Sequence, residues 1–595
     1  MISRRQYSDE LGDLSKPITS LSGGTTGTTD SSLYLPHDGR SYVCGDRSEP
    51  LWRKTVWQVL SETAARFGSR DAAVFCQADI RWSWSEFMRQ VDKFAAGLLA
   101  IGLKPGDRLA IWSPNNPQWL VTQFATARIG LILVTINPAY QSSELAYALN
   151  KSGATALVMA PGFKKLDYLS ILRELVPELD DAEPGQLGSS TLTHLRTVIT
   201  TSNVPEPGLY TFAQVSTIAG PASYQRLDAI SDALDPDDPI NIQFTSGTTG
   251  SPKGATLTHY NIVNNGRFTV ARLNLTERDN LCIPVPLYHC FGMVLGVLGC
   301  ASVGACMVFP DEGFTAESTL DALAAEHCTA LYGVPTMFVG MLESSQFDSS
   351  ALHSLRTGIM AGAPCPEELM KDVIDKMHMR EVTIAYGMTE TSPVSMQSHV
   401  DDPLLKRVGT VGRVHSHTEV KIIDDGGRVV PVGQSGELCT RGYLVMQGYW
   451  NDRQRTEESI DAAGWMHSGD LALIDSEGYC AIVGRVKDML IRGGENIYPR
   501  EIEELLFTHP KIQQAQVFGV PDQRLGERVC AWVVLNAGES MTEGELQQFC
   551  RDRLAIFKVP EYVHFKTELP MTATGKPQKF VMRESMIEEL GTVGK

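Results

Sequence analysis

The pattern of hydrophobic and polar residues predicts alternating helices and strands from about Val56 onwards. Residues 87–101 place apolar side chains at helical spacing, which is typical of an amphipathic helix packed on a core. Short apolar runs at 109–112 and 131–134 predict buried strands. Buried strands that alternate with helices indicate an α/β fold, with layered subdomains and largely parallel sheets.

The pattern changes at both ends of the chain. Residues 1–50 predict a flexible tail, because stretches such as 22–27 (Ser-Gly-Gly-Thr-Thr-Gly) have low complexity and cannot build a core. Towards the C-terminus, 481–485 and 488–492 predict strands, and Pro499 suits the first turn of a helix. We therefore expect a large domain over 51–486 and a small one over 487–595.

An uncharged segment from Gly292 to Phe309 is nearly long enough to cross a bilayer. It contains several glycines, and polar motifs flank it closely. We therefore expect a buried helix followed by a core strand, and no transmembrane segment.

Composition narrows the classes of partner. The chain has 595 residues, a formal net charge of −18 and twelve cysteines. An acidic surface argues against nucleic-acid binding, which needs a basic footprint. The cysteines form no C-x-x-C pair, so we expect reduced thiols in an intracellular compartment.

The strongest chemical signal is the run 245–254 (Thr-Ser-Gly-Thr-Thr-Gly-Ser-Pro-Lys-Gly), which follows the strand-like 240–244. Glycines let backbone N–H groups approach a polyanion, hydroxyls add donors, and Lys253 adds charge. The run lacks the Gly-Lys-Ser/Thr ending of a Walker A loop. These features favour a phosphate-binding loop over a polar surface loop.

This loop resembles the signature of the adenylate-forming (AMP-binding) superfamily, which includes acyl-CoA synthetases. Further motifs of the family follow in its order: Pro286–Gly292, Ala361–Pro364, Tyr386–Thr391, His467–Asp470, Gly484–Asp488 and Thr574–Lys576. The resemblance implies the adenylate-forming enzyme fold, with a large N-terminal domain of αβ-layered subdomains and a small, mobile α+β C-terminal domain. The stretches that most resemble the mitochondrial-type medium-chain acyl-CoA synthetases are 239–265, 331–333, 442–450 and 492–499.

The resemblance also implies a reaction. A carboxylic acid attacks ATP to give acyl-AMP and pyrophosphate, and coenzyme A then takes the acyl group and releases AMP. Lys576 is the expected transition-state cation, because attack on the α-phosphate builds negative charge. Thr245 and Glu390 are expected to hold Mg²⁺, which prefers oxygen ligands.

Other roles follow from the same motifs. Tyr386 is expected to stack on adenine, Asp470 to accept hydrogen bonds from the ribose hydroxyls, and Arg485 to contact ribose or phosphate. Lys487 is expected to be the hinge on which the small domain rotates between the two half-reactions. That rotation brings residues 492–495 towards the pantetheine tunnel.

His289 lies in the aromatic motif beside the acyl pocket, where a functional histidine and a buried structural histidine fit equally well. The catalytic candidates are Lys576, Thr245, Glu390 and His289. The nucleotide- and CoA-binding candidates are Thr245, Ser246, Gly247, Thr248, Thr249, Gly250, Lys253, Gly362, Ala363, Pro364, Tyr386, Gly387, Thr389, Asp470, Arg485, Lys487, Arg492, Gly493, Gly494 and Lys576.

Other functions compete with a medium-chain fatty acid–CoA ligase. An aryl-acid or specialised biosynthetic CoA ligase would use the same motifs, since acyl specificity depends on pocket shape. A peptide-synthetase adenylation module is disfavoured, because 288–291 (Tyr-His-Cys-Phe) has no acid to pair an α-amine. A luciferase-like oxygenase shares the fold. A non-catalytic nucleotide-binding scaffold would be expected to have lost at least one of the site residues.

The location of the protein stays open between mitochondrion, cytoplasm and peroxisome. The family branch points to mitochondria, and Arg4 and Arg5 could begin a presequence. Asp9 and Glu10 follow at once, however, and such presequences avoid acids. The C-terminus is not a Ser-Lys-Leu peroxisomal signal.

Overall fold

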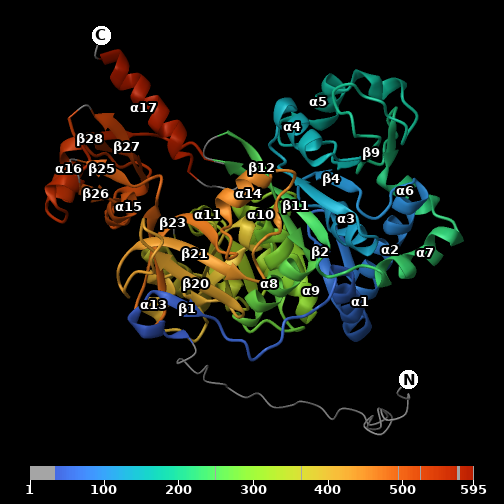
Figure 1. The fold of residues 1–595 in the computed structure, drawn as a ribbon, viewed down its shortest axis with the longest axis horizontal. Coiled ribbons are helices and arrows are strands. Elements are labelled where there is room, and N and C mark those ends of the chain that lie inside the picture. The colour runs from blue at the N-terminus through green and yellow to red at the C-terminus, as the bar shows by residue number, and fades with distance from the viewer. Residues whose placement is uncertain are drawn as a thin grey trace, which may run out of the picture.

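The computed structural model describes residues 34–247, 250–363, 365–492, 495–522, 524–571 and 577–593 (Figure 1). Two large sheets and a five-stranded sheet form the main body of the molecule. The last hundred residues form a smaller unit, from which helix α17 (Lys579–Val593) extends towards the C-terminus (Figure 1).

An eight-stranded sheet contains the apolar runs that predicted buried strands. Strands β4 (Arg108–Trp112) and β5 (Ile132–Ile136) pair in parallel, as expected for strands covered on both faces. The order of its strands is β10 (Leu209–Thr211), β9 (Thr197–Thr200), β6 (Ala156–Met159), β4, β5, β11 (Pro239–Gly247), β12 (Gly250–Thr258) and β22 (Gly448–Tyr449).

A nine-stranded sheet faces the first across one continuous core. Six neighbouring strands of this sheet are parallel: β2, β14, β13, β15, β16 and β17. Their carboxyl ends therefore meet at one edge, where α/β proteins bind ligands. The order of its strands is β19 (Arg413–Val414), β18 (Val394–Gln397), β17 (Glu381–Gly387), β16 (Thr357–Ala361), β15 (Ala330–Gly333), β13 (Asn280–Cys282), β14 (Cys306–Phe309), β2 (Asp71–Phe75) and β3 (Ile80–Ser83).

Helices fill the core between these sheets and cover their outer faces. The predicted amphipathic helix is α2 (Trp84–Ala100), which begins where the Ser83 side chain accepts a hydrogen bond from the Glu86 amide. The other helices of the large domain are α1 (Val56–Phe67), α3 (Pro117–Arg128), α4 (Ser142–Ser152), α5 (Tyr168–Leu175), α6 (Phe212–Ile218), α7 (Pro221–Asp232), α8 (His259–Ala271), α10 (Ala316–Ala325), α11 (Pro335–Glu343), α12 (Glu367–Lys376), α13 (Leu404–Gly409) and α14 (Arg453–Ser459).

The uncharged segment is a buried helix followed by a core strand, as predicted. It forms a π-helical stretch, η4 (Phe291–Leu298), then α9 (Gly299–Val303) and β14. Every residue of η4 is buried in the core. Among the described residues, no helix is both long and apolar enough to cross a membrane.

The five-stranded antiparallel sheet corrects the expected extent of the tail. Its edge strand β1 (Tyr42–Cys44) pairs with β20 (Thr418–Ile423), so this part of 1–50 belongs to the fold. A three-residue strand with one fully buried side chain, Val43, is too short to give a periodic signal. The remaining strands are β21 (Gly436–Gly442), β23 (Met466–Ile474) and β24 (Cys480–Arg485).

The C-terminal unit has hydrophobic clusters of its own. The strand predicted at 488–492 is β25 (Leu490–Arg492), and Pro499 occupies the first turn of α15 (Pro499–Phe507), as expected. The other elements are β26 (Glu495–Ile497), β27 (Ile512–Asp522), β28 (Gly526–Leu535), α16 (Glu543–Arg551) and β29 (Tyr562–Phe565).

Candidate active site

The predicted phosphate loop lies at the tip of the β11–β12 hairpin. The two strands are antiparallel, and Gly247 pairs with Gly250 at the tip. Thr245 is near the end of β11, and Lys253 lies opposite it on β12. Thr248 and Thr249 lie outside the described residues. The hairpin therefore places the hydroxyl of Thr245 and the cation of Lys253 side by side, although they are separated by the loop in sequence.

Glu390 accepts hydrogen bonds from two elements that are distant in sequence. Its Oε1 atom accepts from the Thr245 hydroxyl at 3.1 Å and from the Tyr449 hydroxyl at 2.9 Å. The side chain belongs to a short 3₁₀ turn, η6 (Thr389–Thr391), and the residue is only 5% exposed. The two hydroxyl contacts fix the direction of the carboxylate, which joins the phosphate hairpin to the nine-stranded sheet.

Lys253 completes this network. Its Nζ atom donates a hydrogen bond to the Tyr449 hydroxyl at 2.9 Å. Burial lowers the pKa of Lys253 below its ordinary value; the Glu390 carboxylate opposes this shift, whereas the charges of Arg455 and Lys487 add to it. Burial also raises the pKa of Tyr449 well above its usual range, with the Glu390 charge adding to the effect. The phenol therefore stays protonated and bridges the cation to the carboxylate.

A second carboxylate, Asp470, is held from two sheets. Its Oδ2 atom accepts a hydrogen bond from the Tyr386 hydroxyl at 2.6 Å, and its Oδ1 atom lies 3.0 Å from Arg485 Nε. Asp470 and Arg485 are cross-strand partners on β23 and β24. Burial, with the Asp470 charge, raises the pKa of Tyr386 well above its usual range. Tyr386 thus remains a hydrogen-bond donor to Asp470.

The carboxyl ends of β16 and β17 bring the expected adenine segment beside Tyr386. Ala361 and Ala385 are register partners, so Gly362 and Tyr386 follow at the same sheet edge. Gly362 has φ = +87°, a left-handed conformation that favours glycine. Ala363 follows it, and Pro364 lies outside the described residues.

Gly387 is explained by the backbone alone. A Cβ atom at this position would lie 1.8 Å from the Pro393 carbonyl oxygen, so no larger residue fits without a backbone shift. Two residues on, the Thr389 hydroxyl lies 3.8 Å from Cys290 Sγ, which joins this motif to the aromatic motif.

His289 has a local structural contact. Its Nδ1 atom accepts a hydrogen bond from the Phe291 amide at 3.1 Å, at the start of η4. This contact fits the structural alternative for His289, and its catalytic role stays a prediction.

The candidates beyond the large domain divide into two groups. Arg492 donates to the Phe557 carbonyl at 3.0 Å and lies 3.4 Å from Glu561, so its guanidinium is engaged within the C-terminal unit. Lys487 occupies the turn between β24 and β25. Gly493, Gly494 and Lys576 lie outside the described residues.

Tyr449 is the residue of this network that the sequence did not reveal as a site residue. It belongs to the two-residue strand β22, which pairs with β12 and so reaches Glu390. The surrounding stretch 442–450 carries a family resemblance, but nothing in it marks the phenol as the bridge between Lys253 and Glu390.

Known proteins resemble this chain over nearly its whole length. The AMP-binding enzyme family matches residues 60–450, and the AMP-binding enzyme C-terminal domain matches residues 501–576. The mitochondrial medium-chain acyl-CoA ligase ACSF2 of Homo sapiens is 44% identical over 569 residues, which cover 94% of this chain and 92% of that protein. YngI of Bacillus subtilis, to which an acyl-CoA synthetase activity is attributed, is 47% identical and covers 90% of this chain and 98% of its own length.

Solved structures agree with these matches. The crystal structure of ATP-bound MatB from Rhodopseudomonas palustris superposes with a TM-score of 0.76 at 28% identity, covering 90% of this chain and 99% of MatB. The predicted α/β adenylate-forming fold and the predicted family are therefore confirmed. The order of the motifs, the two family domains and the shared fold establish that this chain belongs to the AMP-binding enzyme family.

Proposed function

We propose that this chain is an acyl-CoA ligase that forms an acyl-adenylate from a carboxylic acid and ATP and then transfers the acyl group to coenzyme A. The observation that carries the proposal is the pair of anchored carboxylates. Glu390 is bound to Thr245 and Tyr449, and Asp470 is bound to Tyr386 and Arg485. Relatives named as acyl-CoA ligases, at 44–46% identity, support the same activity.

The two carboxylates suit two different parts of ATP. Asp470 offers acceptors to the ribose hydroxyls, and Tyr386 with Gly362 borders the sheet edge where adenine would lie. The hairpin that carries Thr245 and Lys253 suits the phosphates, because it combines a hydroxyl, a cation and backbone N–H groups. ATP would thus lie along the carboxyl edge of the nine-stranded sheet.

Glu390 and Thr245 fit a magnesium ion. A carboxylate and a hydroxyl 3.1 Å apart are oxygen donors of the kind that Mg²⁺ prefers, particularly when phosphate oxygens complete its shell. Bound there, the ion would neutralise charge on the phosphates. Tyr449 would then orient Glu390, and Lys253 would compensate the negative charge that remains.

We further propose that Lys576 supplies the transition-state charge and that Lys487 is the hinge that moves it. The turn after β24 separates a sheet of the large domain from the first strand of a unit with its own hydrophobic clusters. Such strand ends absorb changes in φ and ψ. In the second half-reaction, residues 492–495 would approach coenzyme A. Arg492 would keep its contacts with Phe557 and Glu561, because both partners belong to the same C-terminal unit and would rotate with it.

The proposed acid is a medium-chain fatty acid. Relatives named as medium-chain acyl-CoA ligases cover more than nine-tenths of the chain. An aryl or otherwise specialised acid is the second candidate, because the solved relatives include the o-succinylbenzoate CoA synthetase MenE of Bacillus subtilis, at 25% identity. A mitochondrial location is named for human ACSF2, and all twelve cysteines here are free thiols, which suits a reducing compartment.

Pyrophosphate release tests the proposal. The purified chain is incubated with MgATP and straight-chain acids from acetate to stearate, aryl acids and amino acids, with and without coenzyme A. We expect a maximum at medium chain length, with acyl-CoA and AMP as products. A maximum with an aryl acid would support the adenylation and thioester-forming reactions but contradict the proposed medium-chain substrate. No pyrophosphate with any acid, from protein that still binds ATP, would favour the scaffold.

A further inference from the structure

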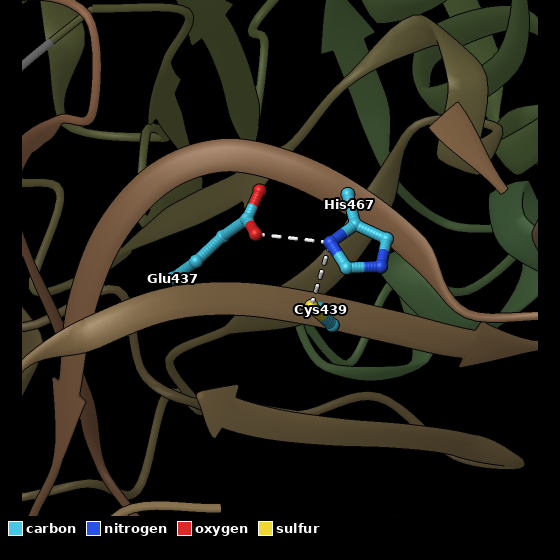
Figure 2. A group of neighbouring side chains, drawn as sticks. All are labelled: Glu437, Cys439 and His467. Atoms are coloured by element: carbon cyan, nitrogen blue, oxygen red, sulfur yellow. Dashed lines mark hydrogen bonds and ion pairs between the residues drawn. The ribbon is translucent and has the colours of Figure 1, made fainter. Parts of the chain in front are cut away.

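The five-stranded sheet carries a cluster of possible metal ligands outside the residues assigned to ATP. Cys439 on β21 and His467 on β23 are cross-strand partners, although 28 residues separate them in sequence. Glu437 lies two residues before Cys439 on β21, so the pleat places both side chains on one face. The three side chains point towards one another (Figure 2).

The sulfur–nitrogen distance fits a tetrahedral ion of the zinc type. His467 Nδ1 lies 3.5 Å from Cys439 Sγ and 2.9 Å from Glu437 Oε2, and all three ligand atoms lie within 4.8 Å of one another. Zn–S and Zn–N bonds of about 2.3 and 2.1 Å place sulfur and nitrogen about 3.6 Å apart in a tetrahedron. The sulfur–nitrogen distance needs almost no change, and the Glu437 oxygen must move outwards by about 0.5 Å.

The surroundings orient two of the three ligands. Glu437 Oε1 accepts a hydrogen bond from the Gly469 amide at 3.1 Å, which leaves Oε2 towards the cluster. Asp461 Oδ2 lies 3.9 Å from His467 Nε2, the ring nitrogen that faces away from Cys439. A carboxylate on the far nitrogen is the usual second partner of a metal-bound histidine.

The ligand set favours a thiophilic ion over Mg²⁺. Cys439 is fully buried, while the side chains of His467 and Glu437 are 30% and 26% exposed, so an ion has access from one side. A sulfur and an imidazole nitrogen suit Zn²⁺ and similar transition metals, whereas Mg²⁺ selects oxygen ligands.

One neighbouring charge opposes cation binding. Lys421 lies directly across from Cys439 on β20, and its charge acts on the thiol. Its ammonium group lies 4.3 Å from the centroid of the Trp465 ring. This contact draws the ammonium charge towards the indole ring. The repulsion that remains weakens cation binding, so removing the Lys421 charge should strengthen it.

We propose that Glu437, Cys439 and His467 bind one Zn²⁺ ion, with water as the fourth ligand. The Cys439 thiol loses its proton to solvent as the sulfur–zinc bond forms. The His467 proton moves through solvent from Nδ1 to Nε2, on the side of Asp461, so Nδ1 binds the ion and its hydrogen bond to Glu437 is lost.

The site also bears on nucleotide binding, a step that rests on the proposed function. Glu437 holds the Gly469 amide, and Gly469 precedes Asp470, the expected ribose ligand. A metal that draws the Glu437 carboxylate outwards shifts this segment. We therefore expect Zn²⁺ to inhibit pyrophosphate release by the wild-type chain.

Cobalt reports on the site directly. Co²⁺ replaces Zn²⁺ in sites of this kind, and a thiolate ligand gives it an intense near-ultraviolet charge-transfer band. The full chain titrated with Co²⁺ should develop this band at one equivalent, and Zn²⁺ should remove it. Excess Mg²⁺ should leave the band unchanged.

Variants assign the ligands. Cys439→Ser should lose the band, whereas Cys76→Ser, which removes a partly accessible thiol outside the cluster, should keep it. Glu437→Gln should weaken Co²⁺ binding by about tenfold or more, as loss of an orienting or ligating group does. Lys421→Met should strengthen binding several-fold, a gain that misfolding cannot produce. Circular dichroism checks each variant for its fold.

Three results would overturn the proposal: no charge-transfer band in the wild-type chain, a band that survives Cys439→Ser, or a band lost with Cys76→Ser alone. Activity is a separate readout. If the band requires Cys439 but the chain activates no acid, the metal-site proposal stands and the proposed ligase function is wrong. If Zn²⁺ inhibits ligase activity equally in the wild type and in Cys439→Ser, the inhibition does not come from this site, and the expected effect of the metal on nucleotide binding is wrong.

Discussion

Tyr449→Phe removes a single oxygen from the centre of the proposed ATP site. That oxygen donates a hydrogen bond to Glu390 at 2.9 Å and accepts one from Lys253 at 2.9 Å. The ring itself is buried, and phenylalanine fills the same space, so the variant isolates the hydroxyl. We expect the variant to fold, to lose stability and to bind MgATP poorly.

The magnitude follows from the partners. A hydrogen bond to a charged group contributes about 1.5–3 kcal/mol, and a buried acceptor left without its donor costs a similar amount. Lys253 is only partly buried, so water can replace its lost contact. Glu390 is buried and keeps only the Thr245 hydroxyl of its two donors, so water does not replace the lost hydrogen bond there. We therefore expect a loss of about 1.5–3 kcal/mol in the free energy of unfolding.

The same loss of orientation should appear in catalysis. If the transition state loses the same amount, about 1.5–3 kcal/mol, kcat/KM for MgATP falls by roughly 10- to 100-fold, since about 1.36 kcal/mol corresponds to a factor of ten in rate. Tyr479→Phe is the matched control. Its hydroxyl donates to Asp402 at 2.8 Å, and its ring is 3% exposed against 5% for Tyr449, but it contacts none of the site residues named above.

Urea unfolding and initial rates of pyrophosphate release, measured on both variants, separate stability from function. We expect a smaller loss of stability in Tyr479→Phe, because Asp402 is only half-buried and water can replace the lost contact, and a loss of kcat/KM for MgATP in Tyr449→Phe only. The reasoning is refuted if Tyr449→Phe loses stability but retains full kcat/KM, or if Tyr479→Phe impairs kcat/KM to the same degree.

Three further predictions concern the expected catalytic lysine, the motif glycine and a buried histidine. Lys576→Ala should abolish adenylate formation from the acid yet leave thioester formation from supplied acyl-AMP largely intact; equal loss of both half-reactions, measured separately, would contradict its role. Gly387→Ala should cost about 1–3 kcal/mol in urea unfolding and reduce activity, because the new Cβ meets the Pro393 carbonyl, whereas Gly409→Ala, with open space around its Cβ, should be nearly neutral. Burial lowers the pKa of His259 from 6.5 to about 3. Between these pH values the unfolded chain binds a proton at this histidine and the folded chain does not. Its stabilising contribution should therefore fall by about 1.36 kcal/mol per pH unit from pH 6.5 towards 3, and unfolding curves of His259→Asn should lack that part of the slope.

Contiguous motifs were predictable from the sequence, and contacts between distant segments were not. The run 245–254 predicts phosphate binding because its glycines, hydroxyl residues and lysine are contiguous in sequence and follow a strand. Tyr449 gives no such signal, since its bond to Glu390 spans 59 residues and depends on how β22 joins the sheet. The pairing of Cys439 with His467 likewise depends on strand register, which sequence spacing does not reveal.

The arrangement of the site suggests how one chain can perform two reactions. Asp470 and Arg485 are paired within one sheet of the large domain, so a rotation beginning at Lys487 would leave their contact intact. The side of the turn before Lys487 is tied to this sheet, because the Val486 amide donates to the Gly469 carbonyl. The hydrogen bond from the Met489 amide to the Arg485 carbonyl spans Lys487 and would break on rotation. The large domain would therefore keep the nucleotide in place during both half-reactions. Lys576, the proposed adenylation group, comes after the turn in sequence, and this separation would let the small domain exchange one catalytic group for another without releasing the intermediate.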